Sequence, residues 1–264
     1  MPCADARLQA SRRLLWRPRT AQGVSTLPGW RDARSFLFVS PHPDDVELGC
    51  GGTLAALVRK GASAEIAVIT DGRLGTRDPG RSPEEIASTR AAEQEAAALM
   101  LGVRLRMLAL PDGGPHDYYR LRDHAVALLR AVRPQYVFVC DPYLPYEAHS
   151  DHRMVGLAVS EAALLSGLPH YAGGSGEAHD VEGVVYYFPR RATDLFALDE
   201  QSLGLRRRAI ACHQSQFGAD DPIVARLEAQ LARNGAAEGA IAAEPLHART
   251  RAQLHIPGPL GAED

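Results

Sequence analysis

The segment Pro41-His42-Pro43-Asp44-Asp45 combines one imidazole with two adjacent carboxylates. It follows the apolar run 35–41, which is typical of a buried strand, and a helical pattern begins directly after it. Imidazole and carboxylate groups at such a position are costly to desolvate without a partner, and a divalent metal ion is a natural partner. His42 and Asp45 are three residues apart across the turn, so both can point at one ion. The alternative is an ordinary turn, because proline and aspartate favour turns.

A second segment, His149-Ser150-Asp151-His152, follows the apolar run 136–141 and also opens a helical pattern. Its second histidine can complete a three-ligand site of nitrogen and oxygen atoms formed by His42, Asp45 and His152. Catalytic zinc commonly keeps three protein ligands and one open position for water. Because the two segments supply one complete ligand set, the sequence predicts a metal site.

Three polar residues of these segments remain outside the predicted ligand set. Asp44 is free to act as a general base on a water molecule. His149 is predicted to face the oxyanion of a tetrahedral intermediate as a cation, with Asp151 as its carboxylate partner.

Five apolar, β-rich runs predict the strands that position these segments. Most of them are continuous rather than alternating, which indicates burial on both faces, as in a parallel sheet covered by helices. Helical stretches alternate with them and have readable ends, such as the capping box that begins at Ser82 and the glycine at 102. This alternation predicts an α/β fold: a Rossmann-like, doubly wound, mostly parallel sheet with helices on both faces. In such a sheet, ligands bind beyond the carboxyl ends of the strands. The strand runs are 35–41, 64–70, 104–110, 136–141 and 183–189.

The length of 264 residues fits one large domain. No clean linker divides the chain. The N-terminal residues lack the apolar region of a secretory signal, and their arginine-rich composition would suit a transit peptide, but we favour residues 1–34 as an N-terminal extension. Residues 35–264 are expected to form a single domain with extra C-terminal helices, one of them opening at Asp221-Pro222.

Composition excludes several classes of protein. A content of 45% hydrophobic and 23% charged residues is typical of a folded globular chain. The net charge of -3 and the 6% aromatic content argue against a nucleic-acid partner. No apolar run reaches the ~18 residues of a membrane span. The four cysteines are far apart and form no CxxC pair, which suits a reducing compartment. We therefore expect a cytoplasmic protein with a small-molecule substrate and leave a homo-oligomer open.

The two histidine segments and several blocks around them resemble the PIG-L/LmbE-like zinc-dependent N-acetylglucosaminyl deacetylase family. That family shares an (A/P)HPDDE-type motif and a later HxDH motif, and the resemblance covers residues 35–217. Val46 stands where the commoner motif has glutamate, with Glu47 after it. Glu147 stands where some members have an aromatic residue. The other matching blocks are Ile69-Thr70-Asp71-Gly72, Arg90-x-x-Glu93, Leu101-Gly102-Val103, Leu110-Pro111-Asp112-Gly113 and His213-x-Ser215-Gln216.

The resemblance implies a role for each matching residue. It implies zinc on the predicted ligands, although two histidines and one aspartate also admit other divalent transition metals. Asp44 would be the base that activates water, and His149, oriented by Asp151, would stabilise the oxyanion or protonate the leaving amine. Arg90 and Asp112 would hold the sugar part of the substrate.

The sequence therefore predicts a metal-dependent hydrolase that removes the acetyl group from an N-acetylated amino sugar or glycoconjugate. One alternative keeps the site but acts as an amidase or deacylase on a thiol- or antibiotic-type sugar conjugate. Another is a non-catalytic Rossmann-like module that binds a sugar or a nucleotide. The acidic turn at 44–45 and the absence of a GxGxxG pattern argue against a nucleotide.

Two further groups of residues have both a functional and a solvated interpretation, and we favour the solvated one for each. His116 lies in an expected loop on the active face, where it could contact substrate, but a solvated position is favoured. Arg206-Arg207-Arg208 would suit an anionic partner, but we expect these residues to form a solvated helix face.

Overall fold

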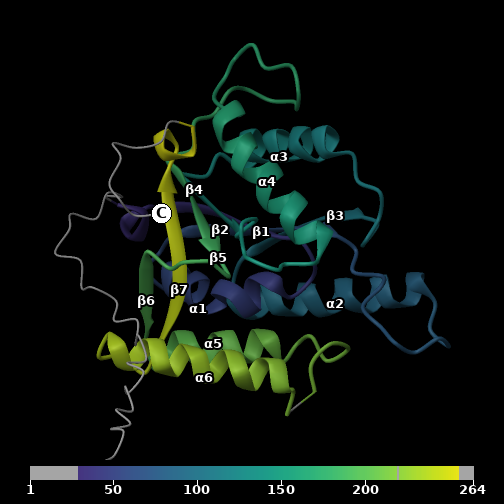
Figure 1. Cartoon of the computed structure of the whole chain (residues 1–264), viewed down its shortest axis with the longest axis vertical. Coiled ribbons are helices and arrows are strands. Elements are labelled where there is room, and N and C mark those ends of the chain that lie inside the picture. Colours follow the sequence, from purple (N-terminus) through teal and green to yellow (C-terminus); the bar gives the residue numbers. More distant parts are fainter. Residues whose placement is uncertain (1–28, 219, 256–264) are drawn as a thin grey trace, which may run out of the picture.

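The computed structural model describes residues 29–218 and 220–255. These residues form a seven-stranded sheet in the order β3-β2-β1-β4-β5-β7-β6 (Figure 1). The first five strands in this order are mutually parallel, and β7 runs antiparallel to both β5 and β6. The predicted mostly parallel α/β fold is confirmed. The strands are β1 (Ser35–Ser40), β2 (Ser63–Thr70), β3 (Arg104–Leu110), β4 (Tyr136–Cys140), β5 (Gly183–Tyr187), β6 (Asp194–Leu198) and β7 (Ala242–Thr250).

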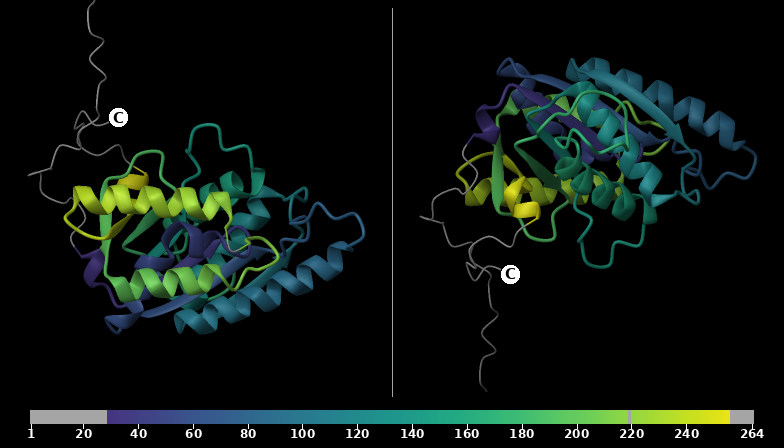
Figure 2. Two further views of the ribbon diagram at one scale, coloured as in Figure 1. Left: turned by 90° about the horizontal axis from the view of Figure 1, so that it is seen from below. Right: turned by 90° about the horizontal axis from the view of Figure 1, so that it is seen from above.

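Helices cover both faces of the sheet. Helices α3 and α4 pack against each other on one face, while α1, α2 and α5 pack together on the other face, where α6 covers β7 (Figures 1 and 2). The predicted helix ends are found at α2, where Ser82 and Glu85 form the capping box and Gly102 ends the helix with a φ of 71°. The helices are α1 (Asp45–Arg59), α2 (Pro83–Leu101), α3 (Tyr118–Val132), α4 (Ser150–Leu165), α5 (Glu200–Ile210) and α6 (Pro222–Ala237).

The strand order creates the place where a site can form. The chain moves outward from β1 through β2 to β3 and then returns to β4 on the other side of β1. Ligands bind at the carboxyl ends of the strands where such a reversal occurs, because the two connections leave in opposite directions and open a crevice. The two histidine segments follow β1 and β4, so both lie at this point.

The C-terminal part of the chain contains two strands that the sequence did not reveal, β6 and β7. The predicted helix at Asp221-Pro222 is α6, but β7 follows it and carries Pro245, a residue that usually argues against an inner strand. The register explains why this proline is tolerated. Only Leu246–Thr250 of β7 pair with β5, so Pro245 lies in the part of β7 that pairs with β6 alone.

Most of the predicted N-terminal extension, residues 1–28, lies outside the described residues. The remainder of that range is packed on the domain: Trp30, in the short 3-10 helix Trp30–Asp32, is buried against Phe138 and Phe196. Among the helices of the described residues, none has the length and apolar character needed to span a membrane.

Candidate metal centre and active site

The first histidine segment forms a tight turn between β1 and α1. The Thr70 backbone N–H and hydroxyl both donate to the Pro41 carbonyl at 2.9 Å, which ties the turn to the end of β2. The Ser40 hydroxyl donates to the His42 carbonyl at 2.6 Å. These bonds fix the backbone from which the His42 and Asp45 side chains project.

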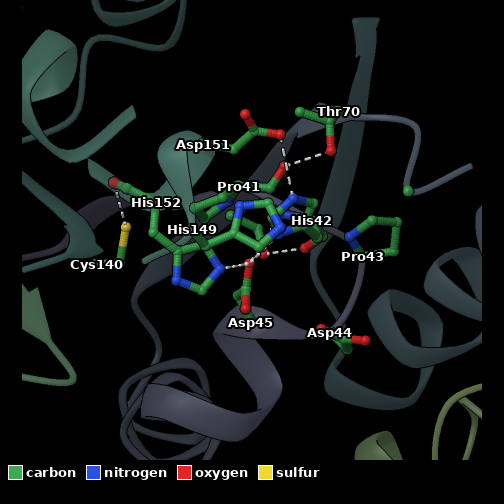
Figure 3. A network of polar contacts seen from close by, with 12 residues as sticks. Pro41, His42, Pro43, Asp44, Asp45, Thr70, Cys140, His149, Asp151 and His152 are labelled. Carbon is green, nitrogen blue, oxygen red and sulfur yellow. Dashed lines mark hydrogen bonds and ion pairs between the residues drawn. The ribbon is translucent and has the colours of Figure 1, made fainter. Parts of the chain in front are cut away.

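The predicted ligand set is brought together at this turn. Asp45 Oδ2 lies 3.2 Å from His42 Nδ1 and 3.4 Å from His152 Nε2, and all three ligand atoms lie within 4.8 Å of one another. Figure 3 shows the imidazoles gathered above Asp45, with Asp44 to one side. Ligand atoms about 2.1 Å from a tetrahedral zinc ion are about 3.4 Å apart, so the observed spacing suits such an ion.

The outer nitrogen of each histidine ligand faces a carboxylate. His42 Nε2 lies 3.2 Å from Asp112 Oδ1 and 3.3 Å from Asp151 Oδ2. His152 Nδ1 lies 3.2 Å from Glu147 Oε2. A carboxylate that accepts from one ring N–H leaves the lone pair of the other nitrogen for a metal. The residues therefore fit a divalent metal on His42, Asp45 and His152.

The carboxylates of this cluster strongly favour a positive charge at His42. Burial alone would lower the pKa of His42, but hydrogen bonds to Asp112, Asp151 and Asp45 raise it to about 12. A proton on His42 thus supplies part of the positive charge that a bound metal cation would supply to these carboxylates.

Asp44 is held in an unusual conformation beside the ligand set. Its φ of 111° is in the left-handed region, which a non-glycine residue adopts only when its surroundings impose it. Gln94 Oε1 accepts from the Asp44 N–H at 3.1 Å, and Arg90 NH2 donates to Asp44 Oδ2 at 2.9 Å and to the Pro43 carbonyl at 2.6 Å. Burial and the neighbouring Asp45 carboxylate raise the pKa of Asp44 to about 8, against the opposing effect of Arg90. A raised pKa is characteristic of a general base.

A cavity of about 300 Å³ opens onto these groups. Both predicted sugar-holding residues, Arg90 and Asp112, line it, although each is also bound within the protein. The Arg90 guanidinium donates to the Gly72 carbonyl as well as to Asp44, and a Cβ on Gly72 would lie 2.6 Å from this guanidinium. The lining residues are His42, Asp44, Leu74, Gly75, Arg90, Asp112, Gly113, His149 and Gln216.

The predicted pairing of His149 with Asp151 differs from what the structure shows. Asp151 hydrogen-bonds to His42 and accepts from the Gly113 N–H at 2.9 Å, so it orients a ligand histidine. Burial and the neighbouring imidazoles lower the pKa of His149, which favours its neutral form when no metal is bound. The ligand atoms of His42, His149 and Asp151 also lie within 4.8 Å of one another, so Asp151 stays close to His149 although its hydrogen bonds go to His42 and Gly113.

Several residues near the site were missed at the level of sequence. Gln94 is four residues after Arg90 on α2, so helical periodicity places both on one face, and this spacing could have revealed it. Glu147 was noted in the sequence as a departure from the family pattern, but its contacts with both histidines of the second segment were not predicted. The prediction for His116 was wrong: its side chain is 9% exposed, with Nε2 3.8 Å from Asp151 Oδ1.

Comparison with known proteins agrees with this arrangement. Residues 37–163 match the model of the PIG-L family, described as GlcNAc-PI de-N-acetylase. The chain is 34% identical over 197 residues to the diacetylchitobiose deacetylase of Thermococcus kodakarensis, covering 72% of this chain and 73% of that protein. The chain belongs to the PIG-L family. The matched residues 37–163 contain both histidine segments that form the site described above.

Solved structures show the same relationship at the level of the fold. The N,N'-diacetylchitobiose deacetylase of Pyrococcus horikoshii is 30% identical, with a TM-score of 0.80, and the alignment covers 87% of this chain and 88% of that one. The 4-carboxy-2-hydroxymuconate hydratase of Pseudomonas putida is only 19% identical but has a TM-score of 0.70 over 81% of this chain and 95% of that one. Because a hydratase shares this fold, the fold alone does not determine the reaction, which depends on the residues of the site.

Proposed function

We propose that the protein is a metal-dependent hydrolase that removes the acetyl group from an N-acetylated amino sugar or glycoconjugate. One observation carries the proposal: the group His42, Asp45 and His152 adjoins Asp44, a buried carboxylate with a raised pKa, at a cavity. Zinc suits the ligand set, and other divalent transition metals are compatible with it.

Different residues of this chain would activate the water molecule and direct its attack on the amide. A metal held by His42, Asp45 and His152 would polarise the amide carbonyl and acidify a water molecule. Asp44 accepts the proton of that water as it attacks the carbonyl carbon. Arg90 keeps the Asp44 carboxylate oriented through its hydrogen bond to Oδ2.

The second half of the reaction requires stabilisation of the oxyanion and a proton for the leaving amine. His149 lines the cavity with its ring 4.4 Å from the His42 ring, so it is placed to donate to a developing oxyanion. Asp44, once protonated, can return its proton to the nitrogen as the C–N bond breaks. Acetate and a free amine are the products.

The substrate class follows from the cavity and from the relatives. The cavity of about 300 Å³ is at the small end of ligand sites, and charged groups on its wall can bind sugar hydroxyls. Two of the relatives compared above are named as diacetylchitobiose deacetylases. We infer that Arg90 and Asp112 hold an N-acetylglucosamine unit at this wall.

The test is an assay of amine release from N-acetylglucosamine, diacetylchitobiose and acylated glycoconjugates by the zinc-loaded protein. Asp44→Asn should lower kcat by about 10²–10⁴-fold, the usual contribution of a general acid–base group, while the bound metal is retained. An Asp44→Asn variant with full activity would refute the base assignment. Failure to release amine from every substrate would refute the deacetylase proposal.

A further inference from the structure

The Glu147 carboxylate connects the two histidines of the HxDH segment. Its Oε2 lies 3.2 Å from His152 Nδ1, and its Oε1 accepts from the His149 backbone N–H at 2.8 Å. The Glu147 side chain is 20% exposed, and the His152 side chain is 17% exposed, so water has limited access to this contact. The Glu147 backbone is also held, because its carbonyl accepts from Arg153 at 2.6 Å.

The contact determines which nitrogen of His152 is free. A carboxylate has only acceptor oxygens, so the Nδ1 atom beside it must carry the proton. The Nε2 atom is then the nitrogen whose lone pair is available to a metal, and it lies 3.4 Å from Asp45 Oδ2, the oxygen that would bind the same ion. The second histidine ligand has the same arrangement, because Asp112 and Asp151 face the outer nitrogen of His42.

We propose that Glu147 is a positioning residue that holds His152 in its metal-binding tautomer and thereby raises the affinity of the site for a divalent cation. This inference rests on the proposed function in one respect, namely that His152 binds a metal. Outer carboxylates of this kind typically change metal affinity by 10–100-fold.

A purely structural role for Glu147 is the competing explanation. His149 is the N-cap residue of α4, and its side chain makes no capping hydrogen bond. In this explanation, the bond from the His149 N–H to Glu147 has the sole function of holding the start of the helix in place. The two roles differ in what they affect. Starting the helix affects the stability of the metal-free protein, whereas holding the tautomer affects the affinity for metal.

The experiment compares zinc affinity, measured by competition with a chromophoric chelator, in the full chain and two variants. Glu147→Ala removes both acceptors and should weaken zinc binding by about 10–100-fold. Glu147→Gln keeps the shape but has one acceptor oxygen for two donors, so a smaller loss of about 10-fold is expected. Glu161→Gln is the matched control. On α4, the helix that carries His152, it removes a carboxylate that accepts from Tyr118 and Arg122, and it should leave zinc affinity unchanged.

Two further measurements separate the outcomes. Long-range ¹H–¹⁵N NMR of the zinc-loaded protein should show a protected Nδ1 proton on His152 that Glu147→Ala loses. Thermal unfolding of the metal-free variants should change little. Unchanged zinc affinity in both variants, with or without a lower melting temperature, would overturn the inference. If the unaltered protein binds no zinc, the metal assignment falls and this inference falls with it. Zinc binding without deacetylation would refute only the proposed reaction.

Discussion

Two clusters of charged side chains contact the same helix, α1, at different points. The first, the site cluster, surrounds the start of α1 and contains Asp44, Asp45, Asp112, Asp151 and Arg90 together with the site histidines. The second, the Arg206 cluster, consists of Arg206, Arg207, Glu228 and Glu244 and surrounds the kink of α1 at Cys50. Both clusters contain buried charges, with Arg207 exposed at the edge of the second, but their charges are balanced in different ways.

The charges of the Arg206 cluster are balanced by its own residues. The Arg206 side chain is fully buried, donates to the Leu48 carbonyl at 2.9 Å and pairs with Glu228 and Glu244. Glu244 accepts from the backbone N–H groups of Gly52 and Thr53, just beyond the kink. Because two arginines face two glutamates, this cluster needs no further ion.

The site cluster is not balanced. It holds four carboxylates and one guanidinium, which pairs with Asp44 alone, so a formal excess of three negative charges remains while the histidines are neutral. A buried excess of this size must be offset by protons or by a cation. The comparison shows that burial of charge alone does not identify a site, whereas an unbalanced buried charge beside a cavity does.

The largest expected effect is the loss of stability when the charge balance of the Arg206 cluster is broken. Arg206→Met leaves Glu244 buried without its partner, and breaking a buried pair in this way costs about 3–5 kcal/mol of unfolding free energy. Chemical denaturation of the two proteins, with denaturant slopes compared, measures this loss.

The double variant Arg206→Met with Glu244→Met removes the charge along with its partner. It should be more stable than Arg206→Met alone, because replacing a whole buried pair by apolar residues is often nearly neutral. A single variant as stable as the unaltered protein would show that Arg206 does not balance Glu244.

The second expected effect tests the excess charge of the site cluster. A metal that binds only the folded protein stabilises it by about 4 kcal/mol at a free concentration one thousand times its dissociation constant. Denaturation with and without zinc measures this gain, which His152→Ala should largely abolish. A gain of equal size in His152→Ala would contradict the ligand assignment, whereas the Arg206 cluster variants should keep the gain in full.

The features that the sequence predicted well are local ones. Both histidine segments follow buried apolar runs, and each such run ends at the same edge of a parallel sheet. The spacing of His42 and Asp45 across one turn was therefore sufficient to predict that their side chains lie close together. The predicted start of α2 at Ser82 and its predicted end at Gly102 also depend on local capping groups, and both are confirmed.

The features that the sequence did not predict depend on partners from distant parts of the chain. Arg206 was expected to lie on a solvated helix face, and this was wrong, because Glu244 of the unpredicted strand β7 buries it. Asp151 was paired with its neighbour His149, but it bonds to His42 on another connection of the sheet. Side-chain pairing across elements is decided by packing, which local patterns do not encode.

His213 offers a third and smaller test, because it is buried without being charged. It lies in the turn after α5 with no side-chain exposure, 3.9 Å from Glu47 on α1. Its ring nitrogens have no hydrogen-bond partner among the residues that the structure describes. Burial, with Arg90 of α2 adding repulsion and Asp45 opposing it, lowers the pKa of His213 to about 4.

The consequence is a loss of stability in acid. Below about pH 6.5 the unfolded chain binds a proton at His213 that the folded chain does not bind until about pH 4, so acidification favours unfolding across this window. The contribution of this one group reaches about 3 kcal/mol at most. His213→Gln should therefore lose less unfolding free energy than the unaltered protein between pH 7 and pH 4, as measured by denaturation at each pH. The same substitution at His124, which is exposed on α3, serves as the control and should leave the pH dependence unchanged. If His213→Gln follows the same pH dependence as the unaltered protein, His213 is protonated inside the fold at an ordinary pH. The carboxylates of Glu47 and the site cluster would then stabilise its positive charge.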